Sequence, residues 1–157
     1  MIIEMMTMSV LQTIVHKVKD SRYYVIVMDE TADLSRKEQE RFSLRFFSHE
    51  DWETHKEFMG FYQTEATDAA SLFKIVKDKL LRFDLPFSDC WGQCYDGASN
   101  MPGKFTGLQA RVKEQEPRAG FVHCDAHSLN LATQDALQNI TACRDCFLMM
   151  KELFNVK

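Results

Sequence analysis

A run of six apolar residues, YYVIVM from Tyr23 to Met28, sets the strongest limit on the fold, and it ends at Asp29. Tyr, Val and Ile favour strands, and an apolar run without alternation is typical of a strand that is buried on both faces. Such a strand needs a neighbouring strand on each side and helices above and below. The sequence therefore predicts an α/β domain built around residues 23–28.

The segments on either side of this run predict further strands and helices. Residues 1–21 are expected to be helical, and Ser9 can cap the apolar stripe that extends to Val18. Alternating apolar residues over 40–50, and a less regular pattern over 55–64, predict an antiparallel hairpin that turns at 48–54. Downstream, the pattern predicts a helix over 67–83 with Thr67 as its N-cap, a strand over 90–96, a short helix over 107–116, a strand over 120–125, a helix from about 128 to beyond 139, and a helical tail.

The predicted order is three strands, a helix, a strand, a helix, a strand and a helix. A meander of three antiparallel strands, extended by helix-linked parallel strands, gives a mixed sheet with helices on its faces. This is the order of the ribonuclease H-like fold, in which the first strand is central and the fourth lies beside it. We therefore expect one mixed sheet of about five strands with flanking helices.

Two acidic residues end strands that this order makes neighbours. Asp29 ends the first strand and Asp96 ends the fourth, so both carboxylates would lie at adjacent strand ends. Carboxylates a few ångströms apart repel each other, and a divalent cation relieves that repulsion. Enzymes of phosphoryl transfer use such carboxylates to hold the metal ions that clamp the reacting oxygens. An Asp at a strand end is also a common turn residue, and that interpretation stays open.

Composition and charge limit the location and the partners of the chain. The 157 residues are 45% hydrophobic and include 12 Phe, which is enough for the core of one domain. The formal net charge of −4 disfavours strong autonomous DNA binding. The apolar runs are too short to span a membrane, and the Met-rich start lacks the features of a signal peptide. With 5 Cys, an odd number, the chain is expected to keep reduced thiols in the nucleus or cytosol and not to be secreted.

Three motifs carry a resemblance to a known family: MDETADLS over 28–35, GQCYDGASNM over 92–101 and HCDAHSLNLA over 123–132. In this order and spacing they resemble the catalytic core of hAT-type DNA transposases. The likeness is strongest to the transposon-derived group in zinc finger MYM-type and THAP-type proteins, and it runs from about Ser9 to the C-terminus. It implies a ribonuclease H-like sheet and an ancestry in metal-dependent DNA cleavage and strand transfer.

The resemblance also implies roles for individual residues. Asp29 matches the first acidic residue of the family's catalytic triad and Asp96 matches the second, so the resemblance implies that both bind Mg²⁺ or Mn²⁺. Cys124 and His127 match a Cys-x-x-His motif that supports the active site in the family. These assignments come from the family and not from the spacing of the residues.

The chain departs from the family where the third acidic residue is expected. In the family that residue lies beyond a large helical insertion, and this chain stops where the insertion should begin. Glu152 is the only late Glu, and it takes no such role because it falls in the first helix of the expected insertion. We therefore expect a single partial domain over 1–157, with a leading helix over 1–21, the sheet and its helices over 22–140 and the start of the insertion over 141–157. Catalysis is not expected of this stretch alone.

Several other side chains suggest binding sites. Lys104, Arg111 and Lys113 follow the Asp96 loop and are the best candidates for contact with DNA phosphates, although a solvated helix face explains the pattern better. Trp91 is expected to pack in the core, and Trp52 to be exposed in the hairpin turn. Zinc coordination by Cys124, His127, Cys143 and Cys146 is compatible with their spacing, although the last two fall in a helical pattern.

A second hypothesis is that the chain is an interaction domain without catalysis. The negative charge, the expected loss of the third acid and the apolar tail CFLMMKELF favour a domesticated domain in a nuclear zinc-finger-type regulator. Binding to DNA would then be weak, and protein partners or a dimer would form in the full-length protein. Metal binding and salt-dependent DNA binding separate the two hypotheses.

Overall fold

The computed structural model describes residues 2–32, 38–63, 68–95, 107–138, 140–142, 144–146 and 149. The chain divides into two compact units, Met1–His123 and Cys124–Lys157. The first unit contains the sheet and the helices that pack on it. The second contains helix α4, Asp125–Gln138, which begins three residues before the position expected from the sequence.

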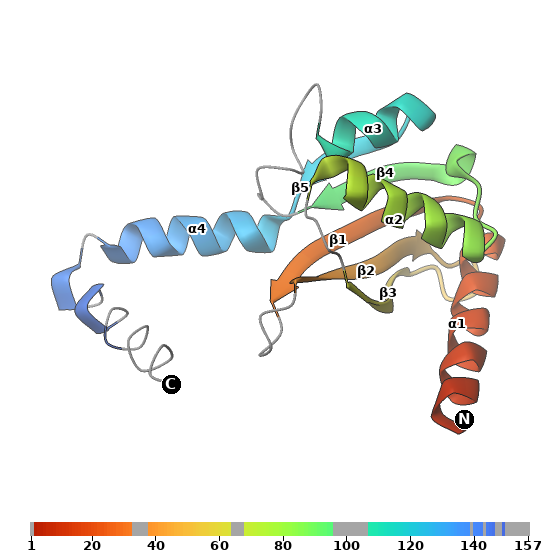
Figure 1. Ribbon diagram of the computed structural model, residues 1–157, viewed down its shortest axis with the longest axis horizontal. Coiled ribbons are helices and arrows are strands. Elements are labelled where there is room, and N and C mark those ends of the chain that lie inside the picture. The colour runs from red at the N-terminus through yellow and green to blue at the C-terminus, as the bar shows by residue number, and fades with distance from the viewer. Residues whose placement is uncertain are drawn as a thin grey trace. The chain divides into compact units, whose positions relative to one another are not determined.

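The first unit is built on a mixed five-stranded sheet in the order β3-β2-β1-β4-β5 (Figure 1). Strand β2 pairs antiparallel with β1 and with β3, whereas β4 pairs parallel with β1 and with β5. The predicted ribonuclease H-like order, with the first strand central and the fourth beside it, is confirmed. The strands are β1 Tyr24–Ala32, β2 Glu38–Phe47, β3 Thr54–Gln63, β4 Cys90–Tyr95 and β5 Gly120–His123.

The hairpin of β2 and β3 contains a β-bulge that the sequence pattern does not predict. Phe42 pairs with Gly60 while Ser43 pairs with Phe58, so Met59 is an extra residue in β3. Gly60 has a φ of 135°, in a region that residues with a side chain rarely adopt. Because of the extra residue, Met59 turns into the core while Phe58 and Phe61 are both exposed.

Three α-helices accompany the sheet: α1 Ile2–Ser21, α2 Ala69–Arg82 and α3 Leu108–Gln115. Helix α1 begins seven residues before Ser9, so the expectation that Ser9 caps it is wrong. The N-cap of α2 is Asp68 and not Thr67: its carboxylate accepts hydrogen bonds from the backbone N–H groups of Ala70 and Ser71. A short 3₁₀ helix, η1 Phe87–Asp89, leads into β4. No described helix is long and apolar enough to cross a membrane.

The core lies on one face of the sheet, between the strands and the helices. Alternate residues of the two central antiparallel strands are buried there, and they meet the apolar stripe of α2, which crosses this face in Figure 1. The contributing side chains are Tyr24, Ile26 and Met28 of β1, Phe42, Leu44 and Phe46 of β2, Leu72, Val76 and Leu80 of α2, and Ile14 and Val18 of α1.

The opposite face of the sheet is less covered. Val25 and Val27 of β1 are half-buried, so the prediction that this strand is buried on both faces holds for one face only. Asp29, Arg41, Arg45 and Phe47 alternate with the core residues and are exposed; we call the face that carries them the open face.

Candidate functional site

Asp29 lies in the second half of β1, on the open face. Its side chain is exposed, and it pairs in register with Arg41 of β2. The Arg41 guanidinium carbon lies 5.7 Å from the centre of the Phe58 ring. Asp29 is therefore an accessible carboxylate, with a basic residue opposite it on the neighbouring strand.

The pairing of β1 with β4 determines what can lie beside Asp29. The strands run parallel, and the register continues through Val27 with Cys94 to Met28 with Tyr95. Asp29 follows Met28 in the sequence, and Asp96 follows Tyr95. The predicted adjacency of the two strands is confirmed; Asp96 itself is outside the described residues.

Two buried tyrosines hold these strands in place from the core side. The Tyr24 hydroxyl donates to the backbone carbonyl of Pro86 at 2.9 Å, and burial raises the pKa of Tyr24 above its usual value. Tyr95 is fully buried with its ring centre 5.9 Å from that of Phe121, and burial raises its pKa well above the usual value. Both side chains are therefore neutral structural groups at physiological pH.

The buried amide of Gln93 connects β4 to the segments that follow it. Its Nε2 donates to the backbone carbonyls of Gln109 in α3 and Ala119 before β5, at 3.2 and 3.1 Å. Cys90, at the start of β4, is buried as well, which raises the pKa of its thiol to about 11. The thiol therefore stays protonated and is no nucleophile.

Two of the three predicted basic contacts, Arg111 and Lys113, lie among the described residues. Arg111 and Lys113 are two positions apart in α3 and so point in different directions. Lys113 is exposed, whereas the Arg111 Nε is buried without a hydrogen-bond partner among the residues described. Lys104 is outside the described residues.

Cys124 and His127 belong to the second unit. The Cys124 carbonyl accepts the Ser128 backbone N–H at 3.0 Å, and both Cys124 and His127 are half-buried. Cys146 is exposed, and Cys143 is outside the described residues. Within the described part of the chain, no group of three or more His, Cys, Asp or Glu side chains could hold a metal ion. The zinc hypothesis therefore gains no support from the described residues.

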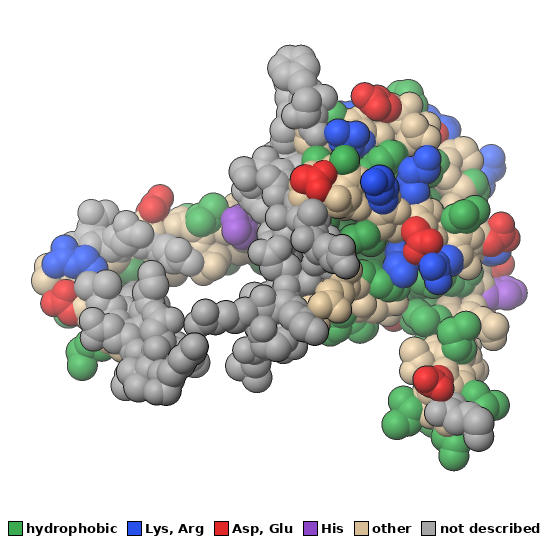
Figure 2. Space-filling model, viewed as in Figure 1, with side chains coloured by type: hydrophobic (Ala, Val, Ile, Leu, Met, Phe, Trp, Pro, Cys, Tyr) green, Lys and Arg blue, Asp and Glu red, His purple; other side chains and the backbone are tan. Residues whose placement is uncertain are grey.

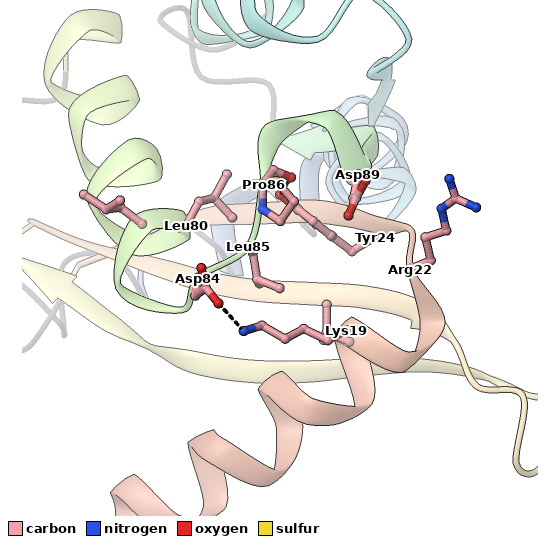
Figure 3. A pocket seen from close by; sticks show the side chains of 10 residues that line it. Lys19, Arg22, Tyr24, Leu80, Asp84, Leu85, Pro86 and Asp89 are labelled. Atoms are coloured by element: carbon pink, nitrogen blue, oxygen red, sulfur yellow. Dashed lines mark hydrogen bonds and ion pairs between the residues drawn. The ribbon is translucent and has the colours of Figure 1, made fainter.

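A cavity of about 500 Å³ lies at the other end of β1 from Asp29 (Figure 3). It is bounded by α1, the end of α2 and the segment that leads into β4. Lys19 reaches across it to Asp84, with an Nζ to Oδ2 distance of 2.6 Å, and this hydrogen bond lowers the pKa of Asp84. The floor is apolar, with Val18, Leu80 and Leu85. The cavity lies between α1 and the end of α2, and the ion pair of Lys19 with Asp84 connects these two parts of the chain.

Sequence reasoning missed an aromatic group on the open face. Trp91 is 50% exposed, so the expectation that it packs in the core is wrong. The register of β1 and β4 shifts between Tyr24 and Val25, and Trp91 is the residue left without a partner in β1. Its ring centre lies 4.1 Å from that of Tyr23. Trp52, in contrast, is exposed as predicted.

The order and directions of the five strands are those of an RNase-like α/β domain. The chain belongs to the ZMYM1/FAM200 RNase-like domain family (DUF4371), whose model matches residues 1–107. The resemblance to transposase-derived zinc finger MYM-type proteins is confirmed at this level.

Curated relatives are similar over most of the chain. The human protein named 52 kDa repressor of the inhibitor of the protein kinase is 27% identical over 115 residues, which are 73% of this chain. The mouse protein of that name is 26% identical over 114 residues. The chain spans 15% of the length of each relative. A solved structure of LC11-RNase H1, isolated from compost, is 16% identical and covers 74% of this chain and 99% of its own, with a TM-score of 0.36, a likeness too distant to add to the strand order.

Proposed function

We propose that this chain is a transposase-derived domain in which Asp29 and Asp96 bind a divalent cation, Mg²⁺ or Mn²⁺, at the end of β1 and β4. The observation that supports this most is the parallel pairing of Met28 with Tyr95. Asp29 directly follows Met28 in the sequence, and Asp96 directly follows Tyr95. On neighbouring strands, the two carboxylates would share a cation that offsets their repulsion.

The chemistry of the donors fits such a cation. Carboxylate oxygens are the ligands that Mg²⁺ and Mn²⁺ prefer, and Asp29 is exposed to solvent. Arg41 opposes binding, because its positive charge lies on the neighbouring strand. A bound ion would polarise a phosphate oxygen of a nucleic acid. Asp29 and Asp96 would hold and orient it, and Arg41 would contact the phosphate.

We propose binding, and not strand cleavage, as the activity of this stretch. Strand transfer uses two metal ions and further carboxylates. The resemblance assigns two acidic residues here, Asp29 and Asp96, and no third. The resemblance to hAT-type transposases supports a place in the nucleus and contact with DNA. The relatives are named as repressors of the inhibitor of the protein kinase.

Titration of Mn²⁺ into the 157-residue chain tests the metal site. We expect saturable binding with a dissociation constant of about 0.1–1 mM, typical of sites with few carboxylates. Asp29→Asn and Asp96→Asn should each weaken binding by about tenfold or more, because each removes one of two charges. Glu114→Gln, an exposed acid on α3, is the matched control and should change nothing. Equal Mn²⁺ affinity in the two Asp variants and the control would contradict the proposal.

A second function, contact between copies of the chain, is favoured by the N-terminal half of α1. Ile2, Ile3, Met5, Met6 and Met8 are 58–79% exposed, and Figure 2 shows hydrophobic side chains around this part of the helix. One side of it forms a groove with Phe58, Met59 and Gly60 of β3. An apolar helix beside an apolar groove can pair with a second copy of itself in a two-fold arrangement.

A further inference from the structure

We propose that a second pocket, on the open face at the start of β1, binds one nucleotide unit: a nucleobase and its phosphate. The pocket has a volume of about 310 Å³ and lies between the start of β1, the end of β2 and the start of β3 and β4. It is at the small end of the range of about 300–1,000 Å³ for small-molecule sites, and so suits a single ring system.

Aromatic side chains line the walls of the pocket. Tyr23, Phe47 and Trp91 line the pocket together with Val25. The Phe47 side chain is 39% exposed and the Trp91 side chain 50%. Tyr23 and Trp91 are packed ring against ring, which fixes their orientation. Phe47 is held by edge contacts with Trp52 and His49. Aromatic surface of this kind, fixed and open to solvent, is what base stacking uses, because every base has a π-face.

The positive charge at the pocket selects an anionic ligand. Arg45 lines it, and Lys56 lies directly opposite Arg45 on the neighbouring strand. Like charges in this position are unfavourable for the sheet. On its other side Arg45 faces Val25, and neither cation forms an ion pair with a described carboxylate. A phosphate between the two would offset their repulsion.

The same charge argues against other occupants. An aromatic cage for methylated lysine needs a site without a competing cation, whereas this pocket contains the cation Arg45. Grooves for proline-rich peptides are aromatic too, but such a peptide does not account for two cations that form no ion pair with the described carboxylates. A nucleotide uses both features of the pocket, the rings for the base and the cations for the phosphate.

This site is separate from the proposed metal site. Val25 in the pocket and Asp29 are four residues apart in β1, which is about 13 Å along a strand. The inference therefore goes beyond the proposed function, and each can fail without the other. Asp29→Asn should leave nucleotide binding unchanged.

Tryptophan fluorescence reads the pocket directly. The chain has 2 Trp, so Trp52→Phe leaves Trp91 as the sole reporter. Adenosine monophosphate should quench it in a saturable way, with a dissociation constant of about 1 mM or lower. Arg45→Gln and Lys56→Gln should each weaken binding by about tenfold, since each removes a phosphate contact. Lys17→Gln, an exposed lysine on α1, is the matched control and should have no effect.

A short fluorescein-labelled oligothymidylate, followed by anisotropy, distinguishes a free nucleotide from a strand. Tighter binding of the strand than of the monophosphate assigns the site to single-stranded nucleic acid, and the reverse assigns it to free nucleotides. Trp91→Leu should weaken binding of the preferred ligand about tenfold. For the strand, Arg45→Gln should also reduce the slope of log affinity against log salt by about 0.7.

Three results overturn the inference. The first is an absence of saturable quenching by both ligands. The second is equal affinity in Arg45→Gln and Lys17→Gln. The third is binding of inorganic phosphate or of a proline-rich peptide that depends on Arg45 or Trp91 while the nucleotide and the strand do not bind. Both cations are exposed, so we expect their Gln variants to keep the fold, and circular dichroism is the check on this.

Discussion

Arg118 and Glu116 together shape the turn between α3 and β5. The Arg118 Nε and Nη2 donate to the two carboxylate oxygens of Glu116 at 2.8 and 2.9 Å, and the Arg118 backbone N–H donates to the same carboxylate. Nη2 also donates to the Ser88 carbonyl at 2.7 Å, so this one guanidinium connects the entry of β5 to the entry of β4. These hydrogen bonds from Arg118 lower the pKa of Glu116 to about 2.

This pair predicts a loss of stability in acid. Glu116 titrates near 4.5 in an unfolded chain and near 2 in the folded one, so its contribution is complete above pH 4.5 and disappears as the pH falls towards 2. We expect the urea midpoint to fall over this interval, and to fall less in Arg118→Gln. Urea unfolding at pH 7, 4.5 and 2.5 measures both. Lys17→Gln, an exposed lysine on α1, is the control, and an equal effect of both variants would contradict the prediction.

At the scale of elements, the bulge in β3 depends on one glycine. A Cβ placed on Gly60 would lie 3.0 Å from the Tyr62 Oη and 3.2 Å from its Cζ, in addition to the strain of a φ of 135°. The Tyr62 hydroxyl donates to the Met59 carbonyl at 2.8 Å, so it cannot move away without loss of that bond.

Gly60→Ala should therefore lower the free energy of unfolding by about 1–3 kcal/mol. Urea denaturation of the two chains measures the difference. Gly120→Ala is the matched control, because a Cβ there meets no atom closer than 4.0 Å and its φ is not positive. A smaller loss for Gly60→Ala than for Gly120→Ala would show that the bulge tolerates a side chain.

The elements were largely predictable because their apolar periods are clear, and the exceptions have local causes. The extent of the leading helix was predicted, and only the role of Ser9 was wrong, because the helix already begins at Ile2. Asp and Thr are both favourable N-cap residues, so the sequence does not decide between Thr67 and Asp68; the position at which the helical backbone begins decides it. The outward position of Trp91 depends on a register shift between β1 and β4 that leaves no sign in the sequence.

The candidate metal site was predictable only as far as strand order. Pattern and resemblance together placed β1 beside β4, and the pairing of Met28 with Tyr95 confirms that. Alternate residues of β1 point to opposite faces of the sheet, and Asp29 lies on the face that the helices do not cover. Because residues 23–28 are all apolar, the sequence does not show which face that is. The aromatic pocket combines residues from four strands, a proximity that only the folded sheet creates.

For the whole molecule, the apolar half of α1 predicts association. We expect the 157-residue chain to form dimers at micromolar concentration, because a solvated helix with Ile2, Ile3, Met5, Met6 and Met8 exposed is unfavourable. Met5→Glu combined with Met8→Glu should give a monomer, as measured by sedimentation velocity. Lys74→Glu combined with Lys77→Glu, on the exposed side of α2, is the control. A monomeric parent chain at these concentrations would remove the second proposed function.

The bulge has a final consequence, at the outer edge of the sheet. Strand β3 is ten residues long and ends the sheet on its side, so its free edge could template the addition of strands from other molecules. An extra residue at Met59 breaks the regular repeat of unpaired amides midway along that edge and increases its twist. The glycine that permits the bulge therefore also makes this edge a poorer template for an added strand.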